Sequence, residues 1–517
     1  MILMKEIEDD VGERLEFEEE YDVSFIRKDL DSNRTFWSKY IWDSLDKDPR
    51  ERKFLFKLDV ILISLLSLGF FCETLDASNV TNAYVSGMRE ELGFQGNQYN
   101  TMLTTRLIGY AIGQIPSNLI LTRLSPRYWL PFCEVMFSVF TFACCAVKSP
   151  TDISIIRFFV GLFQSSFYPG ALFVVGNFYR KDELAKRGVL FISMAGSGQI
   201  FSGILQSAAY TNLDGVMKRS GWRWMFIIDG IISLPIAMAG FLLYPSFPDK
   251  IKPGKIWSAY DIAIMRKRME LEDRKSAAKF TKSHLVKIFG NWKVWILPWL
   301  MIFFSNTQDF LQVYTFWLSN AENSDGTSKY TVPQINLYPN GQVAIFIVWS
   351  WVIGWLSDGA FKGNRWIPIV FTSSFAVIVA IVQAALPTYS TNESVRIAFY
   401  YLVGIGISQG GLMQAWINEL CSESNEERAL ILAFGNDFAT VFQAWVPLLL
   451  WKQTEMPRAF KGTVYTACLY AAIIITVLIT LAFIYKDKNK NKNKNETTTS
   501  DGEINANDSS SKIIEGT

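Results

Sequence analysis

The stretch that decides the fold runs from residue 58 to residue 84 and reads LDVILISLLSLGFFCETLDASNVTNAY. It is predominantly apolar and longer than the roughly 20 residues that a helix needs to cross a bilayer. It nevertheless contains Glu73, Asp76 and Asn79. Because backbone groups in lipid must pair within their own segment, the stretch predicts a transmembrane helix whose polar side chains face protein or water.

Apolar segments of spanning length recur along the whole chain. Those in the first half are expected at about 58–84, 99–122, 128–148, 153–177, 188–210 and 223–245. Those in the second half are expected at about 292–318, 333–357, 365–387, 395–418, 429–451 and 462–485. The pattern predicts an all-α integral membrane protein of about twelve transmembrane helices, arranged as two pseudo-symmetric six-helix bundles.

Polar stretches divide the chain into five expected parts. These are a polar cytosolic N-terminal tail (1–53), an N-terminal six-helix bundle (54–245), a cytosolic central loop (246–290), a C-terminal six-helix bundle (291–485) and a disordered cytosolic C-terminal tail (486–517). An even number of spans places both termini on one side of the membrane. Most of the basic short linkers fall on that side, so the positive-inside rule predicts that both termini are cytosolic.

Composition excludes several classes of function. The 50 Lys and Arg residues balance the 49 Asp and Glu residues, so no basic excess favours binding to nucleic acid. The six cysteines form no CxxC motif and the single histidine, His284, lies in a polar stretch, so no metal site or cofactor is expected. No phosphate-binding loop and no catalytic motif are present, so we expect neither an ATP-driven pump nor an enzyme.

Glu73 and Arg106 are expected at similar depth on two consecutive antiparallel helices, as judged from the rise of about 1.5 Å per residue. Two interpretations stay open. The pair is either a fixed ion pair, or Arg106 faces a cavity and attracts an anionic solute through its planar guanidinium. Asp76 and Asn79 lie one turn apart and form a polar stripe, which either packs on a partner helix or lines a water-filled path.

Polar groups from both halves are expected near mid-membrane and predict a solute site between the halves. The substrate-binding candidates are Arg106, Asn79, Gln164, Gln199, Asn306, Gln409 and Asn436. The proton-coupling candidates are the carboxyl groups Asp76, Glu73, Asp309 and Asp437, of which Asp76 and Asp437 are favoured. A single Gln is more often a contact between helices than a ligand contact. Glu134 is expected near the cytosolic end of its helix, with its carboxylate reaching water.

Several longer motifs resemble those of a known family. They are NAYVSGMREELGFQGN at 82–97, IGQIPSNLILTR at 112–123, RFFVG at 157–161, YPG at 168–170, DELAKR at 182–187, GWRWMFIID at 221–229, ERA at 427–429 and AWVP at 444–447. With these motifs, about residues 41–486 resemble the major facilitator superfamily. Within it, the chain is similar to the fungal anion:cation symporters, which include allantoate, pantothenate, biotin, nicotinate and sulfonate permeases.

The resemblance implies proton-coupled uptake of a small organic anion by alternating access at the plasma membrane. A pantothenate-like vitamin acid, an allantoate-type ureide and a sulfonate are the implied substrates, and we expect a monomer. The resemblance also implies a cytosolic gate formed by Arg123, Arg127, Gly354, Asp358 and Arg365. Two departures stand out, because many relatives carry Lys at the position of Glu73 and Glu at the position of Gln164. A proton-coupled exporter of organic anions or drugs and a nutrient sensor that does not transport remain as alternatives.

Overall fold

The computed structural model describes most of the chain. The described residues are 21–26, 42–121, 124–180, 183–246, 251–271, 286, 288–358, 360–361, 363–389, 393–421 and 425–514. They are helical nearly throughout and contain no β-strand, only an isolated bridge between Glu322 and Ser328.

Six helical rods form the first half. The first rod joins α3 (Pro49–Leu58), η3 (Asp59–Ile63), α4 (Ser64–Ala83), η4 (Tyr84–Met88) and α5 (Arg89–Leu92). The others are α6 (Gln98–Leu121), α7 (Pro126–Ala143), the pair α8 (Pro150–Gln164) and α9 (Phe167–Phe178), α10 (Leu184–Leu213), and α11 (Gly221–Leu243). Short turns η2 (Asp43–Asp46), η5 (Cys144–Ala146) and η6 (Val216–Lys218) flank them.

The second half repeats this arrangement after α12 (Ala259–Glu270). Its rods are α14 (Trp292–Asn306) with η7 (Gln308–Leu311) and α15 (Gln312–Ser319), α16 (Val332–Leu337) with α17 (Asn340–Asp358), α18 (Trp366–Ala385), α19 (Glu393–Ile407) with α20 (Gly410–Leu420), α21 (Asn425–Leu450), and α22 (Phe460–Ile514), which follows η8 (Gln453–Glu455). The described residues thus form two six-helix bundles, as the apolar pattern predicts. We call them the N half and the C half.

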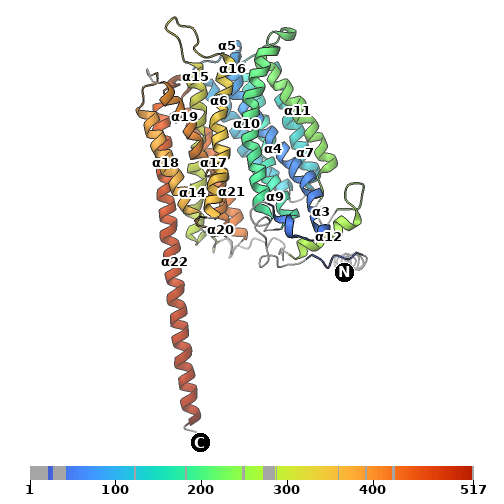
Figure 1. Cartoon of the computed structure of the whole chain (residues 1–517), viewed down its shortest axis with the longest axis vertical. Coiled ribbons are helices and arrows are strands. Elements are labelled where there is room, and N and C mark those ends of the chain that lie inside the picture. Colours follow the sequence, from blue (N-terminus) through green and yellow to red (C-terminus); the bar gives the residue numbers. More distant parts are fainter. Residues whose placement is uncertain are drawn as a thin grey trace.

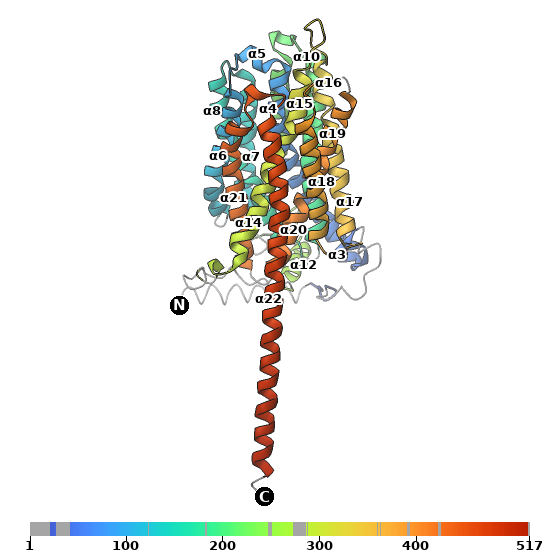
Figure 2. The ribbon, with the colours of Figure 1, turned by 90° about the vertical axis from the view of Figure 1, so that its left-hand side faces the viewer.

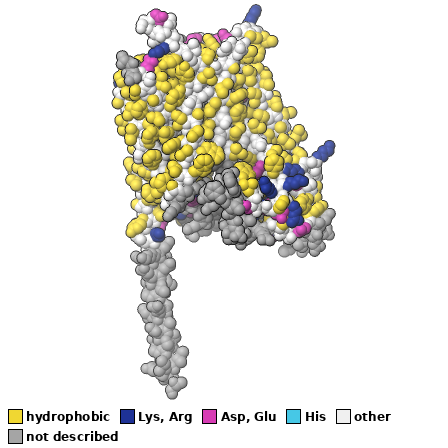
Figure 3. Space-filling view, in the orientation of Figure 1, with side chains coloured by type: hydrophobic (Ala, Val, Ile, Leu, Met, Phe, Trp, Pro, Cys, Tyr) yellow, Lys and Arg dark blue, Asp and Glu magenta, His cyan; other side chains and the backbone are white. Residues whose placement is uncertain are grey.

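The two halves stand side by side (Figure 1). Each has its own apolar clusters, and the halves meet where α6 packs on α21 and where α10 packs on α16 and α17. We call the end of the bundle with α3 and α12 the terminal end, because α22 leaves the bundle there, and the opposite end, with α5 and α16, the distal end (Figure 1). Apolar side chains cover the flanks between these ends (Figure 3), as a lipid-facing belt requires.

Hydropathy alone finds fewer spans than the fold contains. Seven helical stretches of the described residues are long and apolar enough to cross a membrane by length and composition. The rods of α6, α10 and α21 are not among them. These three helices place polar side chains toward the centre of the molecule, and such side chains lower the mean hydropathy of a helix that is still embedded.

The composition of the C-terminal segment predicts a disordered tail from residue 486, and this remains a prediction. Helix α22 continues to Ile514 and projects far beyond the bundle (Figure 2). Residues 486–501 contain neither Pro nor Gly, the two residues that interrupt a helix most strongly, although the Asn and Thr residues of this run have low helix propensity. The rest of the division into five parts remains a prediction.

Candidate functional site

A central cavity of about 290 Å³ lies between the two halves. Its lining comes from α4, α6 and α10 in the N half and from η7, α15, α16, α17 and α21 in the C half. Polar lining residues are Ser78, Thr81, Asn82, Asn100, Thr104, Arg106, Gln199, Gln308, Asp309, Gln312, Thr315, Asn336, Asn340, Gln342 and Gln443. Among the described lining residues, Arg106 carries the one cationic side chain and Asp309 the one carboxyl group.

Arg106 reaches this cavity because α6 and α8 cross at very close range. A Cβ atom on Gly161 of α8 would lie 2.0 Å from the backbone oxygen of Arg106, so glycine at that position permits the approach. The guanidinium Nη1 donates to Oε1 of Gln164 at 3.2 Å. Among the described residues Arg106 forms no ion pair with Glu73, so the geometry gives no support to the fixed-pair interpretation.

Asp76 is sequestered behind the cavity wall rather than exposed to it. Arg157 Nη1 donates to its two carboxylate oxygens at 2.8 and 2.9 Å. The hydroxyl of Thr141 donates to it at 2.9 Å and the amide of Gln164 at 3.0 Å. Asp76 and Arg157 are both buried. The structure therefore places Asp76, a favoured proton-coupling candidate, in a buried ion pair in which both of its carboxylate oxygens accept hydrogen bonds. Gln164 bridges this pair to Arg106.

A second buried chain of hydrogen bonds runs through the N half. Asn79 donates to Asp229 of α11 at 2.6 Å, Ser202 of α10 donates to Asn79 at 2.6 Å, and Asn82 donates to Ser202 at 2.7 Å. Only Asn82 of these lines the cavity. Asn79 therefore lies behind the cavity surface, hydrogen-bonded to Asp229 and Ser202. Asp229 was missed as a candidate, although it ends the GWRWMFIID motif, and its partners come from other helices.

The candidates of the C half are divided between the cavity and the helix breaks. Asp309 lies at the break between α14 and α15, lines the cavity, and leaves Oδ2 buried without a hydrogen-bond partner. Asn306 donates to the backbone of Ile302, and Gln409 accepts from Ser373 at 2.9 Å, both buried away from the cavity. Gln199 of the N half lines the cavity, whereas neither Asn436 nor Asp437 on α21 does.

Hydrogen bonds between the halves close the distal end above this cavity. Asn100 donates to the backbone of Trp451 at 2.8 Å, and Thr104 donates to the backbone of Ala444 at 2.6 Å. Asn336 donates to Ser86 at 2.9 Å, Asn340 donates to the backbone of Ile200 at 3.1 Å, and the backbone of Gln453 donates to Asn97 at 3.1 Å. Toward the terminal end, Tyr168 donates to Gln414 at 3.3 Å. The described contacts therefore seal the distal side more heavily.

Comparison with known proteins identifies the family. A model of the Major Facilitator Superfamily matches residues 66–447 of the 517. The chain belongs to the Major Facilitator Superfamily.

Relatives of this major facilitator protein are transporters rather than enzymes. It is 32% identical over 422 residues to the pantothenate transporter FEN2 of Saccharomyces cerevisiae, covering 80% of each chain. It is 28% identical over 416 residues to the pantothenate transporter liz1 of Schizosaccharomyces pombe, covering 80% of this chain and 79% of that one. Among solved structures, the proton:xylose symporter XylE superposes with a TM-score of 0.63 at 15% identity, covering 84% of this chain and 96% of that one. The chain is a multi-pass membrane transporter of a small molecule.

The expected gate residues of this major facilitator lie at the terminal end. Arg365 donates to Glu419 at 3.0 Å and to Ser357 at 3.1 Å, which ties α17, α18 and α20 together. Arg127 donates to the backbone of Phe241 at 3.2 Å within the N half. Gly354 lies on α17 with open space at its Cβ position. Arg123 and the side chain of Asp358 lie outside the described residues, so the gate remains a prediction.

Sequence reasoning missed a buried ion cluster at the terminal end. Glu183, at the start of α10, binds Lys47 and Arg268 of α12, and Arg268 also pairs with Glu51 at 3.1 Å. Nearby, Arg187 pairs with Asp59 at 2.7 Å. Burial alone would raise the pKa of Glu183, but the charges of Arg268, Lys47 and Arg187 lower it to about 2. The cluster fastens the central-loop helix α12 to the N half.

Proposed function

We propose that this transporter carries a small organic anion, a pantothenate-like vitamin acid, into the cell together with protons. The observation that carries the proposal is Arg106, the cation of a cavity between the two halves whose guanidinium has no carboxylate partner among the described residues. A carboxylate of the solute would supply that partner through two parallel hydrogen bonds. The names of the pantothenate-transporting relatives favour the same solute.

The direction and setting belong to the same proposal. The basic linkers favour a cytosolic terminal end, so the sealed distal end would face outward and the structure would correspond to an inward-facing state. Each half would then rock about the cavity between them in a single chain at the plasma membrane, without need of a second copy. Asp309 is the carboxyl group placed to take a proton within the solute cavity, since its Oδ2 is buried there without a donor.

Uptake by cells that lack their own pantothenate transporter tests this. We expect Arg106→Gln to lower uptake of labelled pantothenate about 10- to 100-fold at unchanged surface abundance, because a charge-assisted hydrogen bond contributes about 1.5–3 kcal/mol. Arg106→Lys keeps the positive charge but lacks the planar guanidinium, so its uptake of pantothenate should lie between those of the wild type and Arg106→Gln. The matched control is Arg458→Gln, which removes an exposed cation near the distal end.

Two outcomes would overturn the proposal. An equal fall in abundance and uptake in Arg106→Gln would assign Arg106 a structural role, and faster loss of preloaded pantothenate from expressing cells would favour an exporter. The neutral alcohol analogue of pantothenate serves as a further control in the uptake assay. Because it lacks the carboxylate, it should compete poorly with labelled pantothenate for uptake by the wild-type protein. Allantoate and a sulfonate are tested as competitors in the same assay. The anion that inhibits uptake of labelled pantothenate most strongly identifies the solute class that the cavity prefers.

A further inference from the structure

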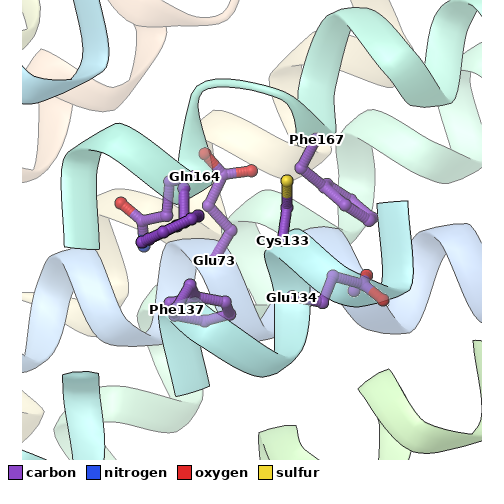
Figure 4. A pocket seen from close by; sticks show the side chains of 8 residues that line it. Glu73, Cys133, Glu134, Phe137, Gln164 and Phe167 are labelled. Carbon is purple, nitrogen blue, oxygen red and sulfur yellow. The ribbon is translucent and has the colours of Figure 1, made fainter. Parts of the chain in front are cut away.

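A second cavity lies inside the N half, apart from the solute cavity. It has a volume of only about 10 Å³. Its lining is Gly69 and Glu73 of α4, Cys133, Glu134 and Phe137 of α7, Phe163 and Gln164 of α8, and Phe167 of α9 (Figure 4). Two carboxyl groups from different helices therefore border one small enclosed space.

Glu134 is buried in this wall without any hydrogen-bond partner. Its side chain is on the ninth residue of the 18-residue helix α7, near the middle of the span, and the residue is 5% exposed. Neither Oε1 nor Oε2 meets a donor, and Oε2 of Glu73 also lacks one. The expectation that the Glu134 carboxylate reaches water at the cytosolic end is therefore wrong, because the fold covers its helix position with α4, α8 and α9.

The space for the carboxyl group is built into the fold. A Cβ atom on Gly69 would lie 2.3 Å from Oε1 of Glu134 and 2.4 Å from the ring of Phe167. Any larger residue at position 69 would therefore displace the carboxyl group. Glycine at this point of α4 lets α7 present Glu134 directly against the backbone of the neighbouring helix.

An unpaired carboxylate is very costly in such surroundings. Burying an ionised carboxylate without compensating donors costs far more than burying the neutral acid, and two carboxylates that share one site cannot both be ionised at low cost. Among the described residues neither Glu134 nor Glu73 forms an ion pair with Lys or Arg. The neutral acid, with the proton covalently bound to a carboxyl oxygen, is the form that the Glu134 environment accommodates.

The surroundings favour a proton over a metal ion. The void is about the size of one water molecule. Besides Gly69, its other walls are three phenylalanine rings, a thiol and the amide of Gln164, whose oxygen already accepts from Arg106, so they offer few of the additional oxygen ligands that a hard cation needs. No group of three His, Cys, Asp or Glu that could hold a metal occurs in the described part of the chain. A proton needs a single oxygen.

One side chain connects the site to Arg106, which lines the solute cavity. Gln164 lines the small void, accepts from Arg106 at 3.2 Å and donates to Asp76 at 3.0 Å. The other titratable groups within electrostatic reach of the two carboxyl groups are Arg106, Tyr110, Asp76, Tyr168, Cys72, Cys133 and Tyr244. Arg106 is thus hydrogen-bonded to Gln164 and lies within electrostatic reach of Glu73.

We propose that Glu134, with Glu73 beside it, is a proton-binding site of the N half that is separate from the solute cavity and coupled to it through Gln164. The inference rests on the proposed proton-coupled function. A carboxylate oxygen binds the proton from water on one side, and the O–H bond breaks to return the proton to water after the halves have moved. One proton is bound and one is released, and no other atom is exchanged.

Two measurements on Glu134→Gln test the site. In vesicles with purified protein, a gradient of one pH unit should drive up to about tenfold accumulation of pantothenate by the wild type at one proton per solute, and none by the variant. Exchange of labelled for unlabelled pantothenate, which needs no net proton movement, should survive in the variant. The matched control is Glu90→Gln, which removes an exposed carboxyl group on α5 and should behave as wild type.

Infrared spectroscopy tests the proton site independently of the proposed substrate, because it needs no transport. Purified wild type at neutral pH should show the carbonyl stretch of a buried protonated carboxylic acid, and the band should weaken in Glu134→Gln but not in Glu90→Gln. Three results would each overturn the inference. They are full proton-driven accumulation by Glu134→Gln, an infrared band unchanged in that variant, and accumulation by the wild type that a sodium gradient drives in place of the pH gradient. Gly69→Ala, which fills the space beside Oε1, should reproduce the transport defect without removing the carboxyl group.

Discussion

Charged side chains lie deep among the helices of the N half, whereas the interior of the C half is held mainly by amides, hydroxyls and aromatic rings. Asp76 and Arg157 pair in the N half, and Glu134 and Asp229 are also buried there. In the C half, Gln409 binds Ser373, and Tyr314, Trp317 and Tyr400 stack at the distal end. Since buried ionisable groups in membranes mark ion pathways, we propose that most of the buried charge, and with it the second proton site, belongs to the N half. The C half mainly shapes the solute cavity, to which it contributes the carboxyl group of Asp309.

The largest expected effect comes from removing one charge of the N-half pair. Asp76→Asn keeps the shape but leaves Arg157 buried without its counter-charge, and breaking a buried pair in this way costs about 3–5 kcal/mol. Ser373→Ala in the C half removes one neutral hydrogen bond to Gln409 and should cost about 1 kcal/mol. Thermal unfolding in detergent, followed by size-exclusion chromatography, measures both.

The double variant Asp76→Asn with Arg157→Gln controls for the cause. It removes both charges and should recover part of the stability lost by the single variant, because no uncompensated charge remains. If Asp76→Asn is no less stable than Ser373→Ala, the buried charges of the N half contribute nothing special to its fold.

The next largest effect concerns the ion pairs at the terminal end of each half and the pH dependence of the stability that they contribute. The pKa of Glu183 is lowered to about 2, so its ionised form stabilises the folded state at pH values above its ordinary pKa of 4.5. This contribution, about 3 kcal/mol, should be constant from pH 7 to pH 5 and should disappear as the pH falls through about 2. The stability difference between wild type and Glu183→Gln should therefore shrink as the pH falls from about 4.5 toward about 2.

Glu419 of the C half supplies the comparison. It pairs with Arg365, but its side chain is 49% exposed, so Glu419→Gln should change stability by less than about 1 kcal/mol at any pH. Unfolding of the three proteins between pH 7 and pH 3 decides the matter. A difference between wild type and Glu183→Gln that grows as the pH falls from 5 would contradict the assigned direction.

The sequence predicts the fold well because lipid imposes one requirement on every span. A segment such as 58–84 must be a helix whatever its neighbours are, so hydropathy and length are sufficient to place it. Even the division of 292–357 agrees with the structure, in which one rod ends at Ser319 and the next begins at Val332. Broken helices such as α14 and α15 are less predictable, because the side-chain bonds of Asn306 and Thr307 at the break go to backbone oxygens three or four residues earlier. Bonds of this kind also form in unbroken helices, so they do not mark a break.

The candidate site is harder to predict, because depth along a helix is readable from the sequence but the facing direction is not. Glu73 and Arg106 were placed at similar depth, yet Arg106 turns to Gln164 of α8 and the cavity. Asp76 was separated by 81 residues from Arg157, and no local pattern links them. The burial of Glu134 could not be predicted from its own helix, because the space for its carboxyl group exists only where Gly69 of α4 has no side chain.

The smallest expected effect compares one tight helix crossing in each half. A Cβ atom on Gly161 would lie 2.0 Å from the backbone oxygen of Arg106, and one on Gly404 would lie 2.3 Å from the backbone oxygen of Gln342. Backbone atoms cannot rotate away, so Gly161→Ala and Gly404→Ala should each cost about 1–3 kcal/mol. Gly176→Ala, with nothing within 4 Å of the added methyl group, is the control and should be neutral or stabilising.

Transport distinguishes the two crossings although their costs in stability are similar. Displacing α6 at Gly161 moves Arg106, the expected partner of the anion, and should raise the KM for pantothenate more than it lowers the maximal rate. Displacing α17 at Gly404 moves Gln342, a neutral lining residue, and should change the KM for the anion less. Equal rises in KM at matched surface abundance would mean that the two halves share anion recognition, and the division of charge in the N half from shape in the C half would then have to be abandoned.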